Sequence, residues 1–300
     1  MKIFITGGSG FIGRHLTNYL LRKGHQVTAV ARSSDRKLIR HDNFHYISAD
    51  TTQGGIWQEA LKGMDAAVNL AGISIFKRWT PTNKKRIYDS RILTTRNLVE
   101  SLPSNNRVVL CSTSAVGCYG NRGDDLLTES EPFGTDFLAG VSRDWEAEAF
   151  KAKDKDVRVV TMRFSIVLGK NGGAMEKMVP AFRFFVGGPL GDGKQWFPWI
   201  HIDDLISAIM FVMENKGING AVNFCSPNPV RNRELAETLG HILKRPAFMP
   251  APAFFIRLFL GELGSSFLSS QRTVPDKLLA YGFNFQYPDI KEAIRNILES

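Results

Sequence analysis

The first thirteen residues, MKIFITGGSGFIG, constrain the fold more than any other part of this 300-residue chain. Lys2 to Thr6 has the β-branched and aromatic composition of a short strand, and an apolar stretch with helical spacing follows. Between them stand Gly7, Gly10 and Gly13, three residues apart. Strand, glycine turn and helix in this order are typical of a dinucleotide-binding turn, in which backbone amides face a pyrophosphate. The alternative is a glycine-rich turn that binds nothing.

The residue after the second predicted strand, Gln26 to Ala31, indicates which dinucleotide is bound. An acidic residue about 20 positions beyond the glycine turn hydrogen-bonds the 2′-hydroxyl of NAD, whereas a guanidinium suits the 2′-phosphate of NADP. Here that residue is Arg32, and Arg36 and Lys37 lie nearby. A solvated basic loop is the alternative, since Asp35 is also present. We predict NADP as the cofactor.

Composition argues against several classes of protein. No apolar run approaches the roughly 18 residues of a membrane span, so we expect no membrane partner. The first strand leaves no room for a signal peptide, and three cysteines without a Cys-x-x-Cys pair suit a reducing cytoplasm and no metal site. The net charge of +9 is spread along the chain, which fits a phosphate-rich cofactor better than a nucleic-acid partner.

Strand and helix patterns alternate through the first half of the chain, as in the βαβ units of a parallel sheet. Further buried strands are predicted at 65–70, 107–112, 157–162 and 221–225. After about residue 170, glycine and proline become more frequent. We therefore predict an α/β, Rossmann-like doubly wound domain over residues 1–170, and a smaller substrate-covering part over 171–300 from which residues 200–226 return to the sheet.

Several longer motifs carry a family resemblance. With TGGSGFIG (6–13), NLAG (69–72), STSAVGCYG (112–120) and RFSIVLG (163–169), the chain resembles an extended short-chain dehydrogenase/reductase. FLAGVSRDWEAEA (137–149) and GGPLGDGKQWFPWIHIDD (187–204) are similar to motifs of its YfcH-like group, whose members are usually labelled sugar-nucleotide epimerases. The C-terminal motifs SPNPVRN and GFNFQYPD resemble the small C-terminal domain of that group.

The resemblance implies a Rossmann-like sheet that binds NADP and a C-terminal part that forms a substrate cleft. Arg32 would meet the 2′-phosphate, and Asp50 either contacts adenine or caps its own loop. The residues implied at the pyrophosphate are Gly7, Gly10, Phe11, Ile12 and Gly13, and those on the adenosine side are Leu70, Ala71 and Gly72.

The chain departs from the superfamily in the residues that move a proton. Other members pair a Ser or Thr with Tyr-x-x-x-Lys: the hydroxyls hold the substrate oxygen, and the lysine lowers the pKa of the tyrosine. Ser114 matches the serine. Residues 133–150, where the Tyr-x-x-x-Lys belongs, contain no tyrosine and no lysine, and Phe137 and Val141 stand there instead. The usual proton relay is therefore missing.

Three further side chains are candidates for binding or chemistry. Tyr119, on the loop expected near the nicotinamide, could donate a proton, although packing beneath that loop is favoured. Arg91 lies on the apolar face of a helix that Thr80 caps, where it needs a partner: a cofactor phosphate, a substrate phosphate or a structural carboxylate. Arg163 either faces the cofactor or braces the edge of the sheet.

The segment 187–204 combines glycines with three aromatic residues, which suits a mobile lid over a base or sugar. Near its end, Asp203 or Asp204 is expected to cap a helix that begins at Leu205. His201, between two apolar residues, is expected to be structural rather than an acid or base.

Two functions stay open. One is an NADP-dependent oxidoreductase or epimerase acting on a small phosphorylated or nucleotide-linked substrate, in which Ser114 holds the oxygen and Tyr119 or a water moves the proton. The other is an NADP(H)-binding regulatory or redox-sensing module without turnover, which the missing Tyr-Lys pair favours. No sequence pattern indicates the oligomeric state.

Overall fold

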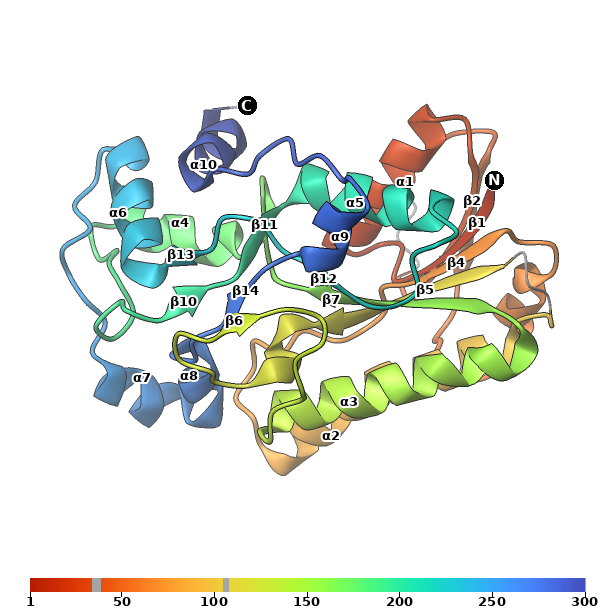
Figure 1. The fold of residues 1–300 in the computed structure, drawn as a ribbon, viewed down its shortest axis with the longest axis horizontal. Coiled ribbons are helices and arrows are strands. Elements are labelled where there is room, and N and C mark those ends of the chain that lie inside the picture. Colours follow the sequence, from red (N-terminus) through yellow and green to blue (C-terminus); the bar gives the residue numbers. More distant parts are fainter. Residues whose placement is uncertain (34–38, 105–107, 300) are drawn as a thin grey trace.

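The computed structural model describes residues 1–33, 39–104 and 108–299, and its centre is a parallel sheet with helices on both faces (Figure 1). Within these ranges, seven strands form the sheet in the order β3-β2-β1-β4-β5-β7-β12. The predicted Rossmann-like α/β fold is therefore confirmed. The strands are β1 Lys2–Thr6, β2 Gln26–Ala31, β3 Phe44–Ser48, β4 Ala66–Asn69, β5 Val109–Ala115, β7 Arg158–Phe164 and β12 Gly220–Phe224.

Helices α2 and α3 cover one face of the sheet, and α1 and α5 cover the other (Figure 1). Short 3-10 turns connect several elements. The helices are α1 Phe11–Arg22, α2 Pro81–Ser101, α3 Phe137–Phe150, α4 Met175–Arg183, α5 Ile202–Glu214, α6 Asn232–Leu243, α7 Ala253–Leu260, α8 Glu262–Phe267, α9 Asp276–Ala280 and α10 Ile290–Glu299, and the 3-10 turns are η1 Ile56–Leu61, η2 Val116–Tyr119 and η3 Lys151–Lys155.

The layers follow from alternation along the strands, because successive side chains of a strand point to opposite faces. In β1, Ile3 and Ile5 join the apolar cluster that contains Leu16 of α1 and Leu205 of α5. Phe4, between them, joins the cluster on the other face with residues of α2 and α3. All three β1 side chains are fully buried, so the sheet is the centre of the core.

The strand order reverses beside β1, with β2 and β3 on one side and β4 and β5 on the other. In doubly wound sheets the ligand crevice lies at the carboxyl ends of the strands at this reversal. Here β1 ends at Thr6 and β4 at Asn69, and the Thr6 hydroxyl donates to the Asn69 side-chain oxygen at 2.6 Å. The topology thus brings the glycine turn and residues 70–72 to the same edge of the sheet.

Most strand predictions are confirmed. The first two strands have the predicted bounds, and those predicted at 65–70, 157–162 and 221–225 differ by one or two residues. The strand predicted at 107–112 covers Val109–Ala115, and Arg107 lies outside the described residues. The helix after the glycine turn ends at Arg22, just before Gly24.

A second body of structure follows β7 and lies at the left of Figure 1. Helices α4, α6 and α10 enclose their own apolar cluster around Trp199, whereas α5 and β12 belong with the main sheet. Three small sheets complete it: β8 Ile166–Gly169 with β9 Gly172–Gly173 and β11 Trp199–His201, β10 Trp196–Phe197 with β13 Val230–Arg231, and β6 Leu126–Leu127 with β14 Arg272–Thr273.

The start of α5 corrects one prediction. The helix begins at Ile202 rather than at Leu205, and its N-cap is His201, not Asp203 or Asp204. The ring Nδ1 of His201 accepts a hydrogen bond from the amide of Asp203 at 3.1 Å, as an N-cap side chain does. Strand β11 passes directly into the helix, which leaves no loop for an aspartate cap. His201 is therefore structural, as expected.

Two buried side chains, Asp204 of α5 and Asn223 of β12, hold the C-terminal segment. Asp204 accepts hydrogen bonds from the amides of Gln286 and Tyr287 at 2.7 and 2.9 Å. The Asn223 amide group donates to the carbonyl of Val274 at 3.0 Å. Residues near the end of the chain therefore complete the hydrogen bonding of residues in the first 225.

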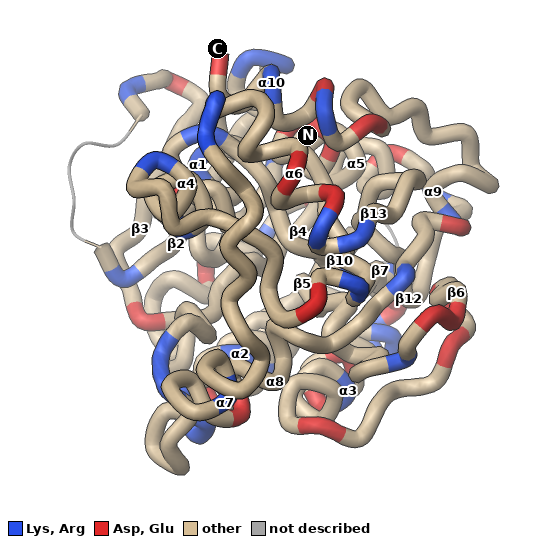
Figure 2. Tube along the Cα trace, turned by 90° about the vertical axis from the view of Figure 1, so that its left-hand side faces the viewer, with Lys and Arg blue, Asp and Glu red and all other residues tan. Residues whose placement is uncertain are grey.

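Charged residues of both signs are mixed along the fold. Figure 2 shows Lys and Arg interspersed with Asp and Glu rather than gathered in one stripe of the described chain. None of the helices in the described ranges is both long and apolar enough to cross a bilayer. The same ranges contain no group of His, Cys, Asp or Glu side chains that could hold a metal ion.

Candidate functional site

Backbone sterics fix the glycine turn between β1 and α1. Gly7 has a φ of +71°, a conformation that favours glycine, and a Cβ on it would lie 2.9 Å from the carbonyl of Leu70. A Cβ on Gly13 would collide with the carbonyl oxygen of Gly7. The Gly7 amide donates to the carbonyl of Val30 in β2 at 2.8 Å. The turn therefore needs these glycines for its shape, whatever it binds.

Helix α1 presents an uncapped N-terminus at this turn. Its N-cap is Gly10, which offers no side chain to the first amides, and its first turn contains no acidic residue. Free amides at a helix N-terminus, together with the helix dipole, attract an anion. The ring of Phe11 packs on Gly172, and Ile12 is half-buried. This arrangement fits a pyrophosphate.

The loop after β4 runs beside the glycine turn and is held firmly. The Thr6 hydroxyl accepts from the amides of Leu70 and Ala71, both at 3.2 Å. The Asn69 amide group donates to hydroxyls on α2 and β5, Thr95 at 2.8 Å and Ser112 at 3.2 Å. The backbone that leads into Gly72 is thereby fixed at the edge of the crevice.

Arg91 reaches from α2 to this loop. Its guanidinium donates to the carbonyls of Ile87 at 3.0 Å and Ile73 at 3.2 Å, and it lies 5.2 Å from the ring centre of Trp145. A Cβ on Gly72 would come within 3.3 Å of it. No carboxylate among the described residues pairs with Arg91, and burial lowers its pKa to about 10. The guanidinium is charged at neutral pH, and an anion in the crevice would offset that charge.

Arg32 is exposed at the carboxyl end of β2, directly beside β1. Its predicted neighbours Arg36 and Lys37 lie outside the described residues. The Asp50 carboxylate accepts from the amide and the hydroxyl of Thr52, at 3.0 and 2.8 Å. Asp50 therefore caps its own loop, the second of the two alternatives considered for it.

A buried polar cluster, composed of Ser114, Tyr119, Glu146, Thr161 and Arg163, lies at the carboxyl ends of β5 and β7. Glu146 of α3 is at its centre and accepts two hydrogen bonds from Arg163, Nε to Oε1 at 2.8 Å and Nη2 to Oε2 at 3.1 Å. The Ser114 hydroxyl donates to Oε1 at 2.7 Å, and the Thr161 hydroxyl donates to Oε2 at 3.3 Å. The carboxylate and the guanidinium thus satisfy each other inside the protein.

Tyr119 is sealed within this buried polar cluster. Its side chain is fully buried, and its hydroxyl donates to Asn223 at 2.7 Å and accepts from Arg163 at 2.9 Å. Burial raises the pKa of the Tyr119 hydroxyl well above its ordinary value. The structure therefore shows the packing alternative, and this geometry speaks against Tyr119 as a proton donor to a ligand.

The structure separates the predicted site residues into two groups. The glycine turn, residues 70–72, Arg32 and Arg91 lie around the carboxyl ends of β1, β2 and β4, where a doubly wound sheet binds its ligand, while Ser114, Tyr119 and Arg163 belong to the buried polar cluster. The contacts of Arg163 match the bracing role we considered for it and not contact with a cofactor. Sequence reasoning missed Glu146, although a carboxylate on the apolar face of α3 was a usable signal.

Phe137 and Val141, the positions where a tyrosine–lysine pair was expected, have apolar side chains in apolar or aromatic surroundings. Phe137 packs edge-on against Trp79, with ring centres 5.1 Å apart, and Val141 is buried. The Lys84 ammonium lies 4.8 Å from the Phe137 ring centre but pairs with Glu262. Nothing in these contacts replaces a tyrosine–lysine pair.

The aromatic residues of segment 187–204 have partners within the protein. Trp196 donates to Asp124 at 2.9 Å, and its ring lies 3.9 Å from the Arg231 guanidinium and 4.8 Å from that of Arg272. Trp199 is buried in the second core. Trp196 and Trp199 of the segment therefore have partners within the protein, and a mobile lid at 187–204 stays a prediction.

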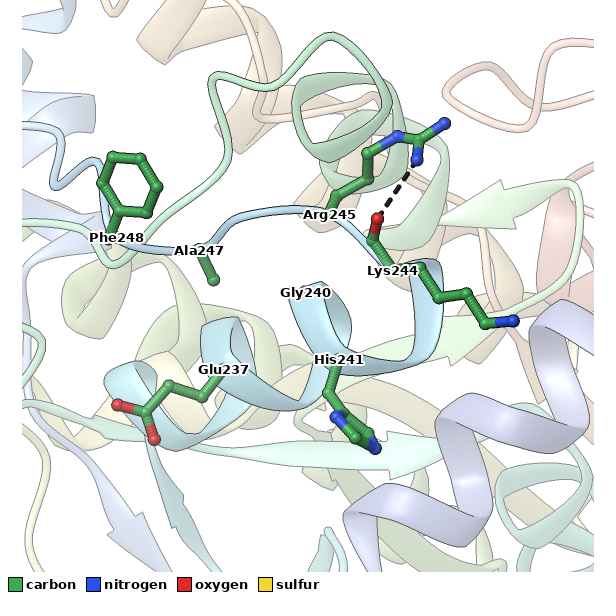
Figure 3. A pocket seen from close by; sticks show the side chains of 7 residues that line it. All are labelled: Glu237, Gly240, His241, Lys244, Arg245, Ala247 and Phe248. Carbon is green, nitrogen blue, oxygen red and sulfur yellow. Dashed lines mark hydrogen bonds between the residues drawn. The ribbon is translucent and has the colours of Figure 1, made fainter.

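Two pockets are lined by residues of α6 and of the segments beside it. Helix α6 lies at the opposite side of the fold from α1 and the glycine turn (Figure 1). The larger, of about 670 Å³, is lined by α6 and by the segment after it, from which Arg245 and Phe248 project (Figure 3). The smaller, of about 330 Å³, shares Phe248 with it. Neither pocket coincides with the crevice.

Known proteins resemble the whole chain. A family model described as the NAD dependent epimerase/dehydratase family matches residues 3–225, and a domain of unknown function (DUF1731) matches residues 251–297. The epimerase family protein SDR39U1 homolog, chloroplastic, of Arabidopsis thaliana is 40% identical over 303 residues, which cover 100% of this chain and 87% of that protein.

Two crystal structures extend this likeness to the fold. Human epimerase family protein SDR39U1 (isoform 2) with NADPH has a TM-score of 0.86 at 32% identity, with 100% of both chains covered. A nucleoside-diphosphate sugar epimerase from Corynebacterium glutamicum has a TM-score of 0.80 at 33% identity, with 99% of this chain and 58% of that chain covered.

Proposed function

Because this chain belongs to the NAD dependent epimerase/dehydratase family, with the C-terminal DUF1731 domain, we propose that it binds NADP(H) in the crevice beside β1 and β4. We further propose that it acts there on a small phosphorylated or nucleotide-linked substrate. The observation that carries the proposal is the uncapped N-terminus of α1 at the glycine turn, next to an exposed Arg32. The NADPH in the structure of the human relative supports this choice of cofactor.

Each part of the crevice has a distinct role in holding the cofactor. The first amides of α1, from Phe11 to Gly13, would bind the pyrophosphate, and residues 70–72 would lie along the adenosine side. Arg32 would pair with the 2′-phosphate through charge-assisted hydrogen bonds. Arg91 would supply positive charge from beneath the loop. When bound, the nicotinamide accepts or donates a hydride.

The substrate would lie between this crevice and the C-terminal part, residues 171–300, which we propose as its cover. The nucleotide-linked class follows from the family and from the sugar-nucleotide relative in Corynebacterium glutamicum. The three cysteines are free and buried, which suits the cytoplasmic location expected from the sequence.

The buried polar cluster favours a second candidate function, an NADP(H)-binding module without turnover. Turnover requires a group that moves a proton to or from the substrate oxygen. The hydroxyls of Ser114 and Tyr119 both donate to acceptors within the protein. For turnover, the Ser114 hydroxyl would therefore have to break its hydrogen bond to Glu146 and form one to the substrate oxygen, and a water would have to carry the proton.

A fluorescence titration with NADPH and NADH tests the cofactor. We expect NADPH to bind more tightly, and Arg32→Ala to weaken NADPH about tenfold or more while leaving NADH unchanged, because only NADPH offers the 2′-phosphate. Arg22→Ala, an exposed arginine at the other end of α1, is the matched control. Equal affinities for the two dinucleotides would contradict the role of Arg32.

Incubation with NADP and a panel of sugar nucleotides separates the two candidates. Epimerised or oxidised product, seen by NMR and lost in Ser114→Ala, would support an enzyme. NADPH binding with no product from any panel member would support the binding module.

A further inference from the structure

Helix α7 exposes nearly all of its large apolar side chains. Its sequence is AFFIRLFL, and within its eight residues only Ile256 is buried. Phe254 is 68% exposed and Phe259 is 71% exposed. Burial of a large apolar side chain stabilises by roughly 1.5–3 kcal/mol, so a soluble protein rarely leaves several together in water. This helix has the composition of a buried element without a cover in the described chain.

Neighbouring segments extend the apolar area. The chain from 186 to 191 runs alongside 249–251, where the amides of Gly191 and Ala251 donate to the carbonyls of Ala251 and Pro189 at 2.8 and 2.9 Å. Residues 251–252 lead directly into α7. The exposed apolar side chains on these adjoining segments, named the α7 surface below, are Phe184, Phe185, Val186, Phe248, Met249, Phe254, Phe255, Leu258, Phe259 and Leu260.

Cations border the α7 surface without acidic partners. Arg183, Lys244, Arg245 and Arg257 are exposed and belong to the same segments, and none forms an ion pair with a described carboxylate. The Arg245 guanidinium lies 4.7 Å from the ring centre of Phe185. Lys244, Arg245 and Phe248 also line the larger pocket (Figure 3). The surface thus combines aromatic side chains with unpaired positive charge.

The combination of aromatic side chains and unpaired cations indicates which kind of partner would cover the α7 surface. In a twofold dimer the same patch meets itself, so both facing surfaces would carry these four cations and neither would bring acidic partners for them. An anionic lipid surface offers both complements at once: phosphates for the cations and an acyl boundary for the aromatic rings. Figure 1 shows α7 at the periphery of the fold, where a flat surface can reach it.

We propose that the α7 surface docks on an anionic phospholipid bilayer. The rings of Phe254 and Phe259 enter the interface, and Arg245 and Arg257 lie at the headgroup phosphates. The contact is peripheral, because no described helix can cross the bilayer. It replaces the sequence-based expectation of no membrane partner, and it does not depend on the proposed cofactor site.

Co-sedimentation of the full chain with vesicles tests this docking. We expect binding to a two-to-one mixture of phosphatidylcholine and phosphatidylglycerol, weak binding to phosphatidylcholine alone, and loss of binding at high salt. Phe254→Ser/Phe259→Ser should abolish binding, and Arg245→Ala/Arg257→Ala should weaken it about fivefold for each charge removed. Ile56→Ser is the matched control, since Ile56 is 86% exposed on η1, far from α7, and should bind like the wild type.

Far-ultraviolet circular dichroism and a cooperative thermal unfolding transition of each variant show that it has folded, so loss of vesicle binding can be assigned to the surface itself. Two results would overturn the proposal. One is equal sedimentation of wild type and Phe254→Ser/Phe259→Ser with anionic vesicles. The other is a dimer in analytical ultracentrifugation that this double variant converts to a monomer, without vesicle binding, because a second copy would then cover α7.

Discussion

The crevice beside the glycine turn and the buried polar cluster lie at the same edge of the sheet. They differ in whether their polar groups have partners within the protein. In the crevice, the first amides of α1 have no side-chain cap and Arg91 has no carboxylate partner. In the cluster, Glu146 accepts from three side chains, and the hydroxyls of Ser114 and Tyr119 are both engaged. The amides and the guanidinium of the crevice could therefore bind an anion from solution, as we propose. The side chains of the buried polar cluster already have their hydrogen-bond partners within the protein.

Two arginines make the contrast concrete. Arg163 and Arg91 both lie at the carboxyl side of the sheet, but Arg163 is paired twice with one carboxylate, whereas Arg91 contacts only backbone carbonyls, a serine hydroxyl and an aromatic ring. The paired guanidinium of Arg163 supports the fold. For the guanidinium of Arg91, which has no carboxylate partner among the described residues, we propose contact with the cofactor.

The largest effect is expected from breaking the cluster. Glu146→Ala leaves the Arg163 charge buried and unpaired, and we expect the free energy of unfolding in urea to fall by about 3–5 kcal/mol. Asp144→Ala, which removes a half-buried carboxylate that pairs with Arg143 and accepts a hydrogen bond from Tyr88, should cost only about 1 kcal/mol. NADPH affinity of the folded Glu146→Ala protein should be unchanged. Equal losses of unfolding free energy in the two variants would show that the Glu146–Arg163 pair contributes no more to stability than an ion pair at the surface.

The second effect concerns the crevice. Arg91→Met should weaken NADPH binding about tenfold, because the cofactor loses a charged partner, while the free energy of unfolding changes by less than about 1 kcal/mol. Arg163→Met should do the reverse, lowering stability and leaving affinity unchanged in the folded protein. Titration and urea unfolding of both variants measure the two quantities. If Arg91→Met destabilised the protein as strongly as Arg163→Met, Arg91 would be structural.

A smaller effect is expected for the tyrosine. Tyr119→Phe removes the hydroxyl bonded to Asn223 and Arg163, and should lower the free energy of unfolding by about 1 kcal/mol. NADPH affinity should not change, and neither should the pH profile of any turnover. A shifted pH profile would show that Tyr119 takes part in the reaction, so that the buried polar cluster would belong to the active site together with the crevice.

The smallest effect is a pH dependence. Since burial lowers the pKa of Arg91 to about 10, the unfolded chain binds this proton more tightly than the folded protein. The charged guanidinium therefore costs stability at neutral pH, and the cost declines as the pH rises through about 10. Relative to Arg91→Met, the wild type should gain about a few tenths of a kcal/mol between neutral pH and pH 10. No change relative to Arg91→Met over this range would show that the pKa of Arg91 is not lowered to about 10 in the folded protein.

The fold was accessible from sequence because its signals are local. The strands at Lys2–Thr6 and Gln26–Ala31 lie beside glycines whose spacing fixes the turn. Thr80, followed by Pro81, marks the start of α2, and its hydroxyl does accept a hydrogen bond from the Asn83 amide. Each of these signals depends on residues only a few positions apart.

The buried polar cluster was not accessible, because its contacts join distant positions. Ser114 matches a catalytic motif, but its acceptor, Glu146, is 32 residues further along and on a different element. A motif gives the residue type and not the direction in which a hydroxyl points. The predicted start of α5 was wrong for a related reason. Aspartate is a strong N-cap, but β11 ends directly at the helix, so His201 occupies the N-cap position.

The hydrogen bonds from Asn223 to Val274, and from the amides of Gln286 and Tyr287 to Asp204, have a consequence for biosynthesis. A ribosome makes the sheet first and these partners last. Until residues 274–287 emerge, Asp204 lacks both amides that donate to its carboxylate, and the Asn223 side chain lacks one of its two carbonyl acceptors, so the hydrogen bonding of the nascent domain is incomplete. The two family-matched segments, 3–225 and 251–297, therefore complete their folding together. A chain cut between them would leave buried polar groups of the first segment without hydrogen-bond partners.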